Sequence, residues 1–200
     1  MNPLKIFYMN QGGGNWGAIH YSNYDLILLA ERDTSVDPLN FDVRWGSGDS
    51  LPPMSIQVNY NDGRLISSPI DLDRTSQHVR PIISFKIVGT NIRIVFVHLK
   101  SGNAPAATNG LQNAISSQNI QEDMGSNKPI LWIGDFNRAG YDKQLFSSAQ
   151  LLYEGGGQSK WYLDRVYATG RWQGFTVTVQ KVTESNDHRH VGLGIEIVRK

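Results

Sequence analysis

Short stretches of uninterrupted apolar residues recur along this chain, and each ends close to a polar residue that can take part in chemistry. The stretches are Leu26 to Ala30, Val95 to Val97 and Pro129 to Ile133, and the polar residues that follow them are Glu31, His98 and Asp135. Such stretches are typical of strands buried on both faces. A chain with several of them must cover its sheets with further layers, so the polar residues at the strand ends can converge along one rim of a sandwich.

The composition fits one globular domain built from strands and turns. The 200 residues are 40% hydrophobic and 18% charged, with 20 Gly and 8 Pro, and they suffice for a core in a single domain, 1–200. The formal net charge is +1, so contact with a polyanion has to come from a local cluster of Arg and Lys. The chain lacks cysteine, which excludes disulfides and thiolate metal sites. We expect no signal peptide, because the N-terminus lacks a long apolar run, and no membrane span, because no run of about 18 apolar residues occurs in the sequence.

Apolar patterning predicts mainly strands, with one longer helix. The predicted strands are 4–9, 26–30, 54–60, 64–70, 81–88, 91–99, 129–133, 161–168, 175–182 and 191–198. Two hairpins are expected, one turning at Asn61-Asp62-Gly63 and a clearer one at Gly89-Thr90. The spacing of apolar residues predicts a helix over 106–124, and a short helix is expected after the glycine loop at 12–14. The stretch 33–51 is expected to be a loop.

Asn10 and Glu31 are candidate metal ligands. The ordinary role of Glu31 would be an exposed carboxylate that pairs with Arg32 or with water. The ordinary role of Asn10 would be turn chemistry ahead of the glycine loop. A hard divalent cation such as Mg²⁺ prefers carboxylate and amide oxygens and keeps several waters, so both residues also fit a metal site at the rim.

Asp135, Asn137 and His98 could act on a substrate bound at the same rim. Asp135 and Asn137 alternate along a segment expected to be extended, so they should point the same way while Phe136 points into the core. The ordinary alternative is a turn at Asp-x-Asn, which gives no obvious reason for the large apolar Phe136. Asp135 would then serve a metal or a nucleophile, and Asn137 would stabilise charge that develops in the transition state. His98 is either satisfied by a backbone carbonyl or protonates a leaving oxygen. Carboxylates, imidazole and amide together are the groups required for metal-dependent cleavage of a phosphate ester.

A second imidazole is available in Asn186-Asp187-His188 near the C-terminus. Asp164 lies in an apolar strand, and burying it unpaired would be costly, so a pair with His188 is favoured. The alternative partner, Arg165, is less favoured because adjacent strand residues face opposite sides. The guanidinium candidates for binding phosphate oxygens are Arg80 and Arg138. The remaining candidates, His20 and His190, are interpreted as surface or structural histidines.

The ordered set of segments resembles the endonuclease/exonuclease/phosphatase superfamily. The segments are Tyr8 to Gly12, Asp25 to Glu31, Arg80 to Ile83, Val95 to His98, Trp132 to Arg138, Leu163 to Ala168 and Asn186 to His188. Within the superfamily, the Arg-Pro pair, the Gly-Asp-Phe-Asn-Arg string and the Leu-Asp strand look most like the catalytic B subunit of cytolethal distending toxin, a relative of deoxyribonuclease I. Ala30 and Asn186 depart from the family pattern, which usually has Gln and Ser there.

This resemblance implies an α+β fold, the four-layer αββα sandwich of deoxyribonuclease I, with the active site at one rim. It implies that the metal is held by Asn10, Glu31 and Asp187, that His98 and His188 are the acid and base, and that Asp164 orients His188. Asp135 and Asn137 would hold the nucleophilic water and the transition state, and Arg80 and Arg138 would contact phosphate. The implied cofactor is Mg²⁺, with Mn²⁺ or Ca²⁺ as alternatives.

The leading hypothesis is therefore a Mg²⁺-dependent phosphodiesterase, a toxin-type deoxyribonuclease that acts on DNA or another phosphodiester. The resemblance also implies delivery subunits as partners and a protein that is secreted or delivered into host cells. Two alternatives stay open: a phosphoinositide or other lipid phosphatase of the same fold, and a catalytically silent binding domain. The presence of both carboxylates, the amide and both histidines argues against the silent domain.

Overall fold

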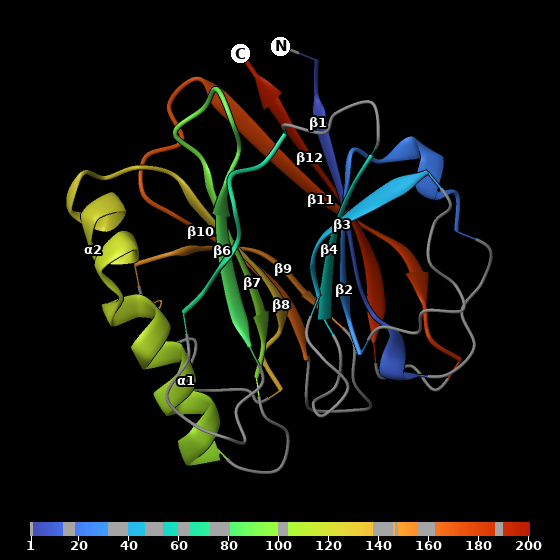
Figure 1. Ribbon diagram of the computed structural model, residues 1–200, viewed down its shortest axis with the longest axis horizontal. Helices are drawn as coiled ribbons and strands as arrows, with labels where there is room; N and C mark the ends of the chain where they lie inside the picture. Colours follow the sequence, from blue (N-terminus) through green and yellow to red (C-terminus); the bar gives the residue numbers. More distant parts are fainter. Residues whose placement is uncertain are drawn as a thin grey trace.

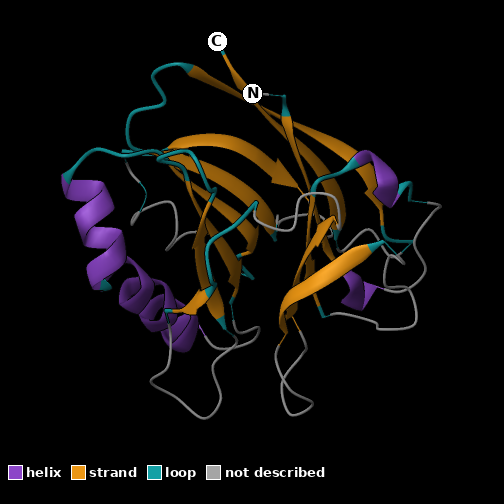
Figure 2. Ribbon diagram, turned by 45° about the horizontal axis from the view of Figure 1, so that its top comes forward, coloured by secondary structure: helices purple, strands orange, loops and turns teal. Residues whose placement is uncertain are grey.

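The protein, seen as a computed structural model, consists of two six-stranded sheets packed face to face (Figures 1 and 2). The structure describes residues 2–13, 19–31, 40–46, 54–59, 65–72, 81–99, 104–137, 146, 148–155, 163–186 and 190–200. The first sheet has the order β11 (Phe175–Glu184), β12 (Val191–Arg199), β1 (Leu4–Asn10), β2 (Leu26–Ala30), β4 (Met54–Asn59) and β3 (Phe41–Gly46). The second has the order β5 (Ile70–Asp71), β6 (Ile82–Lys86), β7 (Arg93–His98), β8 (Ile130–Asp135), β10 (Asp164–Thr169) and β9 (Gln150–Gly155).

Both sheets follow the same plan. Each has a parallel pair at its centre, β1 with β2 and β7 with β8, and two antiparallel strands on either side of that pair. The central strands are buried along almost their whole length, as expected for strands covered on both faces. Parallel neighbours end at the same edge of a sheet, so each sheet brings two strand ends to one rim.

The main core lies between the sheets. Its members come from alternate positions of facing strands, for example Ile6, Leu28, Ile94, Ile133 and Leu193. This alternation places the intervening residues on the outer faces, where they need further cover.

The outer face of the second sheet is covered by α1 (Ala104–Ser116) and α2 (Gln118–Gly125), which lie along it in Figure 1. Leu111, Ala114 and Ile120 from these helices pack against Val95 and Trp132. The predicted single helix is therefore broken at Ser117, which takes an extended conformation between α1 and α2.

The outer face of the first sheet is covered differently. Phe7, Met9, Ile27, Leu29 and Phe41 form a smaller cluster, and side chains from a 3-10 turn pack on it. That turn is η2 (Tyr21–Asn23), and a second one, η1 (Gln11–Gly13), follows β1 directly. Among the described residues this outer layer consists of short turns, whereas the layer on the other side consists of α-helices.

Several predicted elements agree with the structure and others do not. The hairpin at Gly89-Thr90 is confirmed as β6 and β7. The hairpin at Asn61-Asp62-Gly63 is wrong as a pairing, because β4 pairs with β2 and β3, whereas β5 pairs with β6 in the other sheet; the turn itself lies outside the described residues. The predicted loop 33–51 contains the edge strand β3, whose alternation of Phe, Val and Trp with Asp and Arg is a strand signal. β9 is a further strand that the apolar pattern does not indicate.

The arrangement confirms the predicted fold class, an α+β sandwich of the deoxyribonuclease I type. None of the helices in the described part of the chain is long and apolar enough to cross a membrane. The chain termini lie together at one end of the sandwich, since β1 starts and β12 ends there (Figure 1).

Candidate functional site

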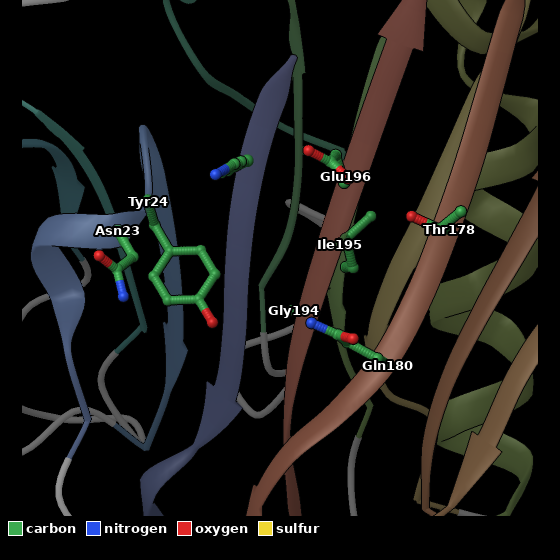
Figure 3. A pocket seen from close by; sticks show the side chains of 8 residues that line it. Asn23, Tyr24, Thr178, Gln180, Gly194, Ile195 and Glu196 are labelled. Carbon is green, nitrogen blue, oxygen red and sulfur yellow. The ribbon is translucent and has the colours of Figure 1, made fainter.

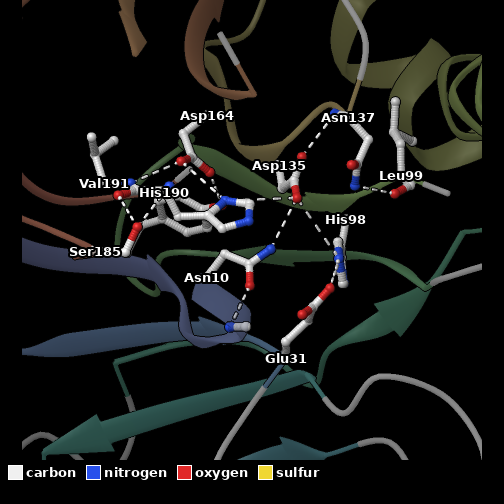
Figure 4. A network of polar contacts seen from close by, with 12 residues as sticks. Asn10, Glu31, His98, Leu99, Asp135, Asn137, Asp164, Ser185, His190 and Val191 are labelled. Carbon is white, nitrogen blue, oxygen red and sulfur yellow. Dashed lines mark hydrogen bonds and ion pairs between the residues drawn. The ribbon is translucent and has the colours of Figure 1, made fainter. Parts of the chain in front are cut away.

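Four of the predicted site residues occupy equivalent places in the two sheets. Asn10 ends β1 and Glu31 directly follows β2, while His98 and Asp135 end β7 and β8 as register partners. All four stand at the carboxyl ends of the parallel pairs. Figure 4 shows their side chains turned toward one another across the gap between the sheets.

Asp135 is at the centre of this group (Figure 4). Its side chain is buried, and Asn10 donates a hydrogen bond from Nδ2 to Asp135 Oδ2 over 2.9 Å. The same oxygen lies 3.9 Å from His98 Nε2 and 4.0 Å from His190 Nδ1. Two imidazoles therefore lie near a single carboxylate oxygen, so groups that can give and take protons are gathered at this rim.

Asn137 is brought to Asp135 by a turn rather than by strand alternation. Its φ of 48° is in the left-handed region, so the segment is not extended at this residue. The backbone N–H of Asn137 donates to Asp135 Oδ1 over 2.7 Å, and its Nδ2 donates to the carbonyl oxygen of Leu99 over 2.6 Å. Phe136 does point into the core, where it packs edge-on against Tyr167.

Glu31 reaches the site through an uncommon backbone conformation. Its φ of 50° is in the left-handed region, which costs free energy for a residue with a side chain. Its Oε1 lies 3.4 Å from His98 Nε2, and about a quarter of its side chain, 27%, is exposed. Strain of this kind persists where the surroundings hold a residue in place, and it clusters at functional sites.

Gly12 leaves the space that the Glu31 carboxylate occupies. A Cβ atom at Gly12 would come 1.6 Å from Glu31 Oε2 and 3.3 Å from Asn10 Oδ1. The backbone N–H of Gly12 also donates to Asn10 Oδ1 over 2.9 Å. Glu31 Oε2 and Asn10 Oδ1 therefore both lie close to the place that a side chain at position 12 would occupy.

Asp164 is buried beside this group and has several partners. Its Oδ1 accepts a hydrogen bond from the hydroxyl of Tyr8 over 2.6 Å, and its Oδ2 accepts one from the backbone N–H of Val191 over 2.9 Å. His190 Nδ1 lies 3.4 Å from Oδ2, within ion-pair range but long for a hydrogen bond. Arg165 faces the other side and pairs with Glu154 over 3.1 Å, in agreement with the alternation argument.

The pKa of His190 is set by opposing influences. Burial alone lowers the pKa of an imidazole, but the neighbouring Asp164, followed by Asp135 and Glu31, outweighs burial and raises the pKa of His190 above its ordinary value. From the sequence His190 is expected to be a surface or structural histidine, but it lies among the site carboxylates. The only sequence signal that could have found it is its proximity to the predicted His188.

The donor set at this rim fits a hard divalent cation. Within the described ranges, no three His, Asp or Glu side chains are grouped closely enough to hold an ion by themselves. Glu31 and Asn10 nevertheless direct oxygens into the same space above Gly12. Magnesium is commonly bound through one or two protein carboxylates and completes its shell with water and substrate phosphate, so a carboxylate with a neighbouring amide oxygen fits this ion.

Four of the predicted site residues lie outside the described residues: Arg80, Arg138, Asp187 and His188. Their assigned roles remain predictions. The structure adds three residues that the sequence analysis assigns no role at the site, namely Tyr8, Gly12 and His190.

A separate polar pocket lies on the outer face of the first sheet (Figure 3). It has a volume of about 480 Å³, and its walls include Lys5, Tyr24, Gln180 and Glu196. Lys5 is near the start of β1, whereas Asn10 ends the same strand at the rim. The pocket is therefore distinct from the polar group around Asp135.

No protein-family model matches the sequence, and no curated protein matches it either. Solved structures do match the fold. A mannosyl-6-phosphatase from Bacteroides thetaiotaomicron aligns with a TM-score of 0.67 and 14% identity over 98% of this chain and 99% of its own. The D. rerio protein TDP2, complexed with a single-strand DNA product, aligns with a TM-score of 0.66 and 11% identity over 99% of this chain and 100% of its own.

A third structure carries the family name itself. It is an endonuclease/exonuclease/phosphatase family protein from Bacteroides thetaiotaomicron, with a TM-score of 0.63 and 13% identity over 100% of this chain and 99% of its own. The fold is theirs. At these identities the similarity establishes the sandwich shared with this family along the full length of the chain, and the chemistry has to be argued from the site.

Proposed function

We propose that this protein is a metal-dependent phosphoester hydrolase of the endonuclease/exonuclease/phosphatase superfamily and, more specifically, a phosphodiesterase that cleaves DNA in the manner of a toxin-type deoxyribonuclease. The observation that carries the proposal is the position of Asp135 Oδ2, which has an imidazole on either side at 3.9 and 4.0 Å and an amide donor at 2.9 Å. A catalytically silent domain has no use for such a buried, hydrogen-bonded group of ionisable residues.

In the proposed reaction an imidazole held by Asp164 takes a proton from the attacking water. His98, on the other side of Asp135, protonates the departing oxygen. Asp135 orients the attacking water, and it is itself held by the amide of Asn10 at Oδ2 and by the backbone N–H of Asn137 at Oδ1. Glu31 and Asn10 would hold a divalent cation, which would stabilise the charge that develops on the phosphoryl oxygens.

Two histidines are candidates for the base. The family motif favours His188, which lies outside the described residues, and the geometry of the described residues favours His190, at 3.4 Å from Asp164. Substituting each by alanine separates them, because removal of a general base lowers the rate by about 10²-fold or more. The other histidine should tolerate alanine with a loss well below that.

DNA is the proposed substrate, with Arg80 and Arg138 as the phosphate contacts. Support comes from a fold neighbour solved with a single-strand DNA product. The net charge of +1 means that contact with DNA has to come from a local cluster of cations such as these arginines. A second candidate, a phosphatase of small phosphorylated molecules, is favoured by the neighbour described as a mannosyl-6-phosphatase.

The test is a plasmid-nicking assay with Mg²⁺ and with chelator, run beside release of inorganic phosphate from a phosphorylated sugar and from a soluble phosphoinositide. We expect nicking that chelator abolishes and that His98→Ala strongly reduces. If phosphate is released and the plasmid is not nicked, the proposed activity is a phosphatase and not a nuclease. Absence of both activities in the presence of Mg²⁺, Mn²⁺ and Ca²⁺ would overturn the proposal of a hydrolase.

A further inference from the structure

Strand β1 sends two side chains from the first sheet to two carboxylates of the second. Tyr8 and Asn10 are two residues apart and therefore lie on the same face of the strand. Asn10 donates to Asp135 over 2.9 Å, and Tyr8 donates to Asp164 over 2.6 Å. Tyr8 thus stands in the same relation to Asp164 as Asn10 does to Asp135.

The hydroxyl of Tyr8 divides the two oxygens of Asp164 between different partners. Oδ1 accepts from Tyr8, and Oδ2 accepts from the backbone of Val191 and faces His190 Nδ1. Tyr8 and Asp164 are both fully buried, so water does not compete for these bonds. A phenol has an ordinary pKa of about 10 and is protonated at neutral pH, so Tyr8 acts as the donor in this bond.

We propose that Tyr8 is a positioning residue that acts through Asp164: its hydroxyl fixes the carboxylate so that Oδ2 is presented to the imidazole of His190. The hydrogen bond links β1 to the imidazole side of the site, and it joins residues 156 positions apart in the chain. The role in catalysis rests on the proposed function, but the effect on the imidazole does not.

The hydroxyl can be separated from the ring by a single substitution. The Tyr8 ring packs edge-on against Phe96, with centroids 6.0 Å apart, and lies within the core between the sheets. Tyr8→Phe keeps this packing and removes only the donor. Tyr24→Phe is the matched control, because Tyr24 lies on the outer face of the same sheet, against Phe7.

The first measurement follows the five histidines by NMR during a pH titration in metal-free buffer. The charged groups that face His190 are Asp164, Asp135 and Glu31, and Tyr8→Phe leaves all three in place. Without the phenol, Asp164 shares less of its charge with a donor and attracts the imidazolium more strongly. We expect the pKa of His190 to rise in Tyr8→Phe and to stay at the wild-type value in Tyr24→Phe. Identical titration curves for Tyr8→Phe and the wild type would overturn the proposal.

The second measurement is hydrolysis. Tyr8→Phe should lower kcat by about 10-fold with little change in KM, the usual effect of removing an outer partner of a catalytic group. In an Asp164→Asn background the same substitution should have no further effect, because Tyr8 acts only through Asp164. If Tyr8→Phe lowers kcat by the full 10-fold both in the wild type and in Asp164→Asn, Tyr8 does not act through Asp164. If the wild type hydrolyses no phosphoester, the proposed function fails, and the histidine titration still decides whether Tyr8 controls the imidazole.

Discussion

Asp135 and Asp164 stand directly opposite each other on β8 and β10, and both are buried. Two like charges placed across a sheet from one another repel, and burial removes the water that would screen them. Each carboxylate therefore needs donors of its own, and each receives one from β1, from Asn10 and Tyr8 respectively. The site depends on this contact between the sheets.

The two carboxylates also explain why a histidine, His190, lies near both of them. His190 Nδ1 lies 3.4 Å from Asp164 Oδ2 and 4.0 Å from Asp135 Oδ2. A protonated imidazole at this place offsets part of the carboxylate repulsion, and a neutral one offsets none of it. The protonation state of His190 should therefore influence both stability and catalysis.

Stability should reveal the charge of His190 by its dependence on pH. The pKa of His190 is raised in the folded protein, so its favourable contribution is fully present below the ordinary histidine pKa of about 6.5 and is lost as pH rises through the raised value. In metal-free buffer, the difference in thermal midpoint between the wild type and His190→Gln should be larger at pH 6 than at pH 9. A difference that grows with pH would show that His190 is held neutral.

An ion-pair network at the start of β7, at the opposite end of the strand from His98, should contribute to stability without affecting catalysis. Asp123 of α2 accepts from Arg93 Nε at 2.6 Å, Lys128 Nζ at 3.1 Å and Lys86 Nζ at 3.3 Å. Burial opposes ionisation of Asp123, but the hydrogen bonds and charges of these cations, Arg93 foremost, prevail and lower its pKa. Arg93 begins β7 and His98 ends it, so the network is remote from the site.

We expect Asp123→Asn to lower the free energy of unfolding by about 3 kcal/mol, because it leaves buried Arg93 without a counter-charge. Denaturant unfolding measures this loss, and kcat for phosphoester hydrolysis, assayed well below the midpoint, should equal that of the wild type. A fall in kcat in the folded variant would mean that the network reaches the site along β7.

The sequence predicts the strand ends of the site well because the signal is local. Buried strands read as continuous apolar runs, so the polar residue at the end of each run marks the rim, as at Glu31, His98 and Asp135. Asn137 was placed correctly beside Asp135, but for a different physical reason. A left-handed turn, not strand alternation, brings it there.

The residues that the sequence analysis missed depend on contacts between distant segments. In the sequence Tyr8 looks like an ordinary buried residue of β1. Only the packing of the two sheets shows that its hydroxyl donates a hydrogen bond to Asp164. Gly12 reads as one of several loop glycines, and its steric role appears only when Glu31 is placed above it. β3 is different, because its alternating pattern is visible in the sequence and was outweighed by the polar residues around it.

Arg80 and Arg138, as proposed phosphate contacts, should affect DNA binding uniformly across sequences. Replacing either by alanine should weaken binding and reduce the slope of log K against log salt by about 1, since one phosphate contact is lost. Fluorescence anisotropy with two oligonucleotides of unrelated sequence, over a range of salt concentrations, measures both effects. Selective loss of one sequence would point to base contacts instead.

Gly12 provides the sharpest test of the metal site, because a single methyl group should disturb it. An alanine Cβ at Gly12 would come 1.6 Å from Glu31 Oε2, so the carboxylate has to leave its present place. The backbone φ of Gly12 is not in the left-handed region, so alanine is compatible with the backbone and acts through contact alone. Gly125→Ala is the matched control, since a Cβ there meets nothing within 4 Å and its φ is likewise ordinary.

We expect Gly12→Ala to weaken Mn²⁺ binding by about 10-fold or more, the usual effect of displacing a ligand's support, while the thermal midpoint in chelator stays within a few degrees of the wild type. Electron paramagnetic resonance of free Mn²⁺ measures the affinity directly and needs no substrate. Unchanged Mn²⁺ affinity in a folded Gly12→Ala protein would remove Glu31 and Asn10 as the metal ligands, whatever the enzyme hydrolyses.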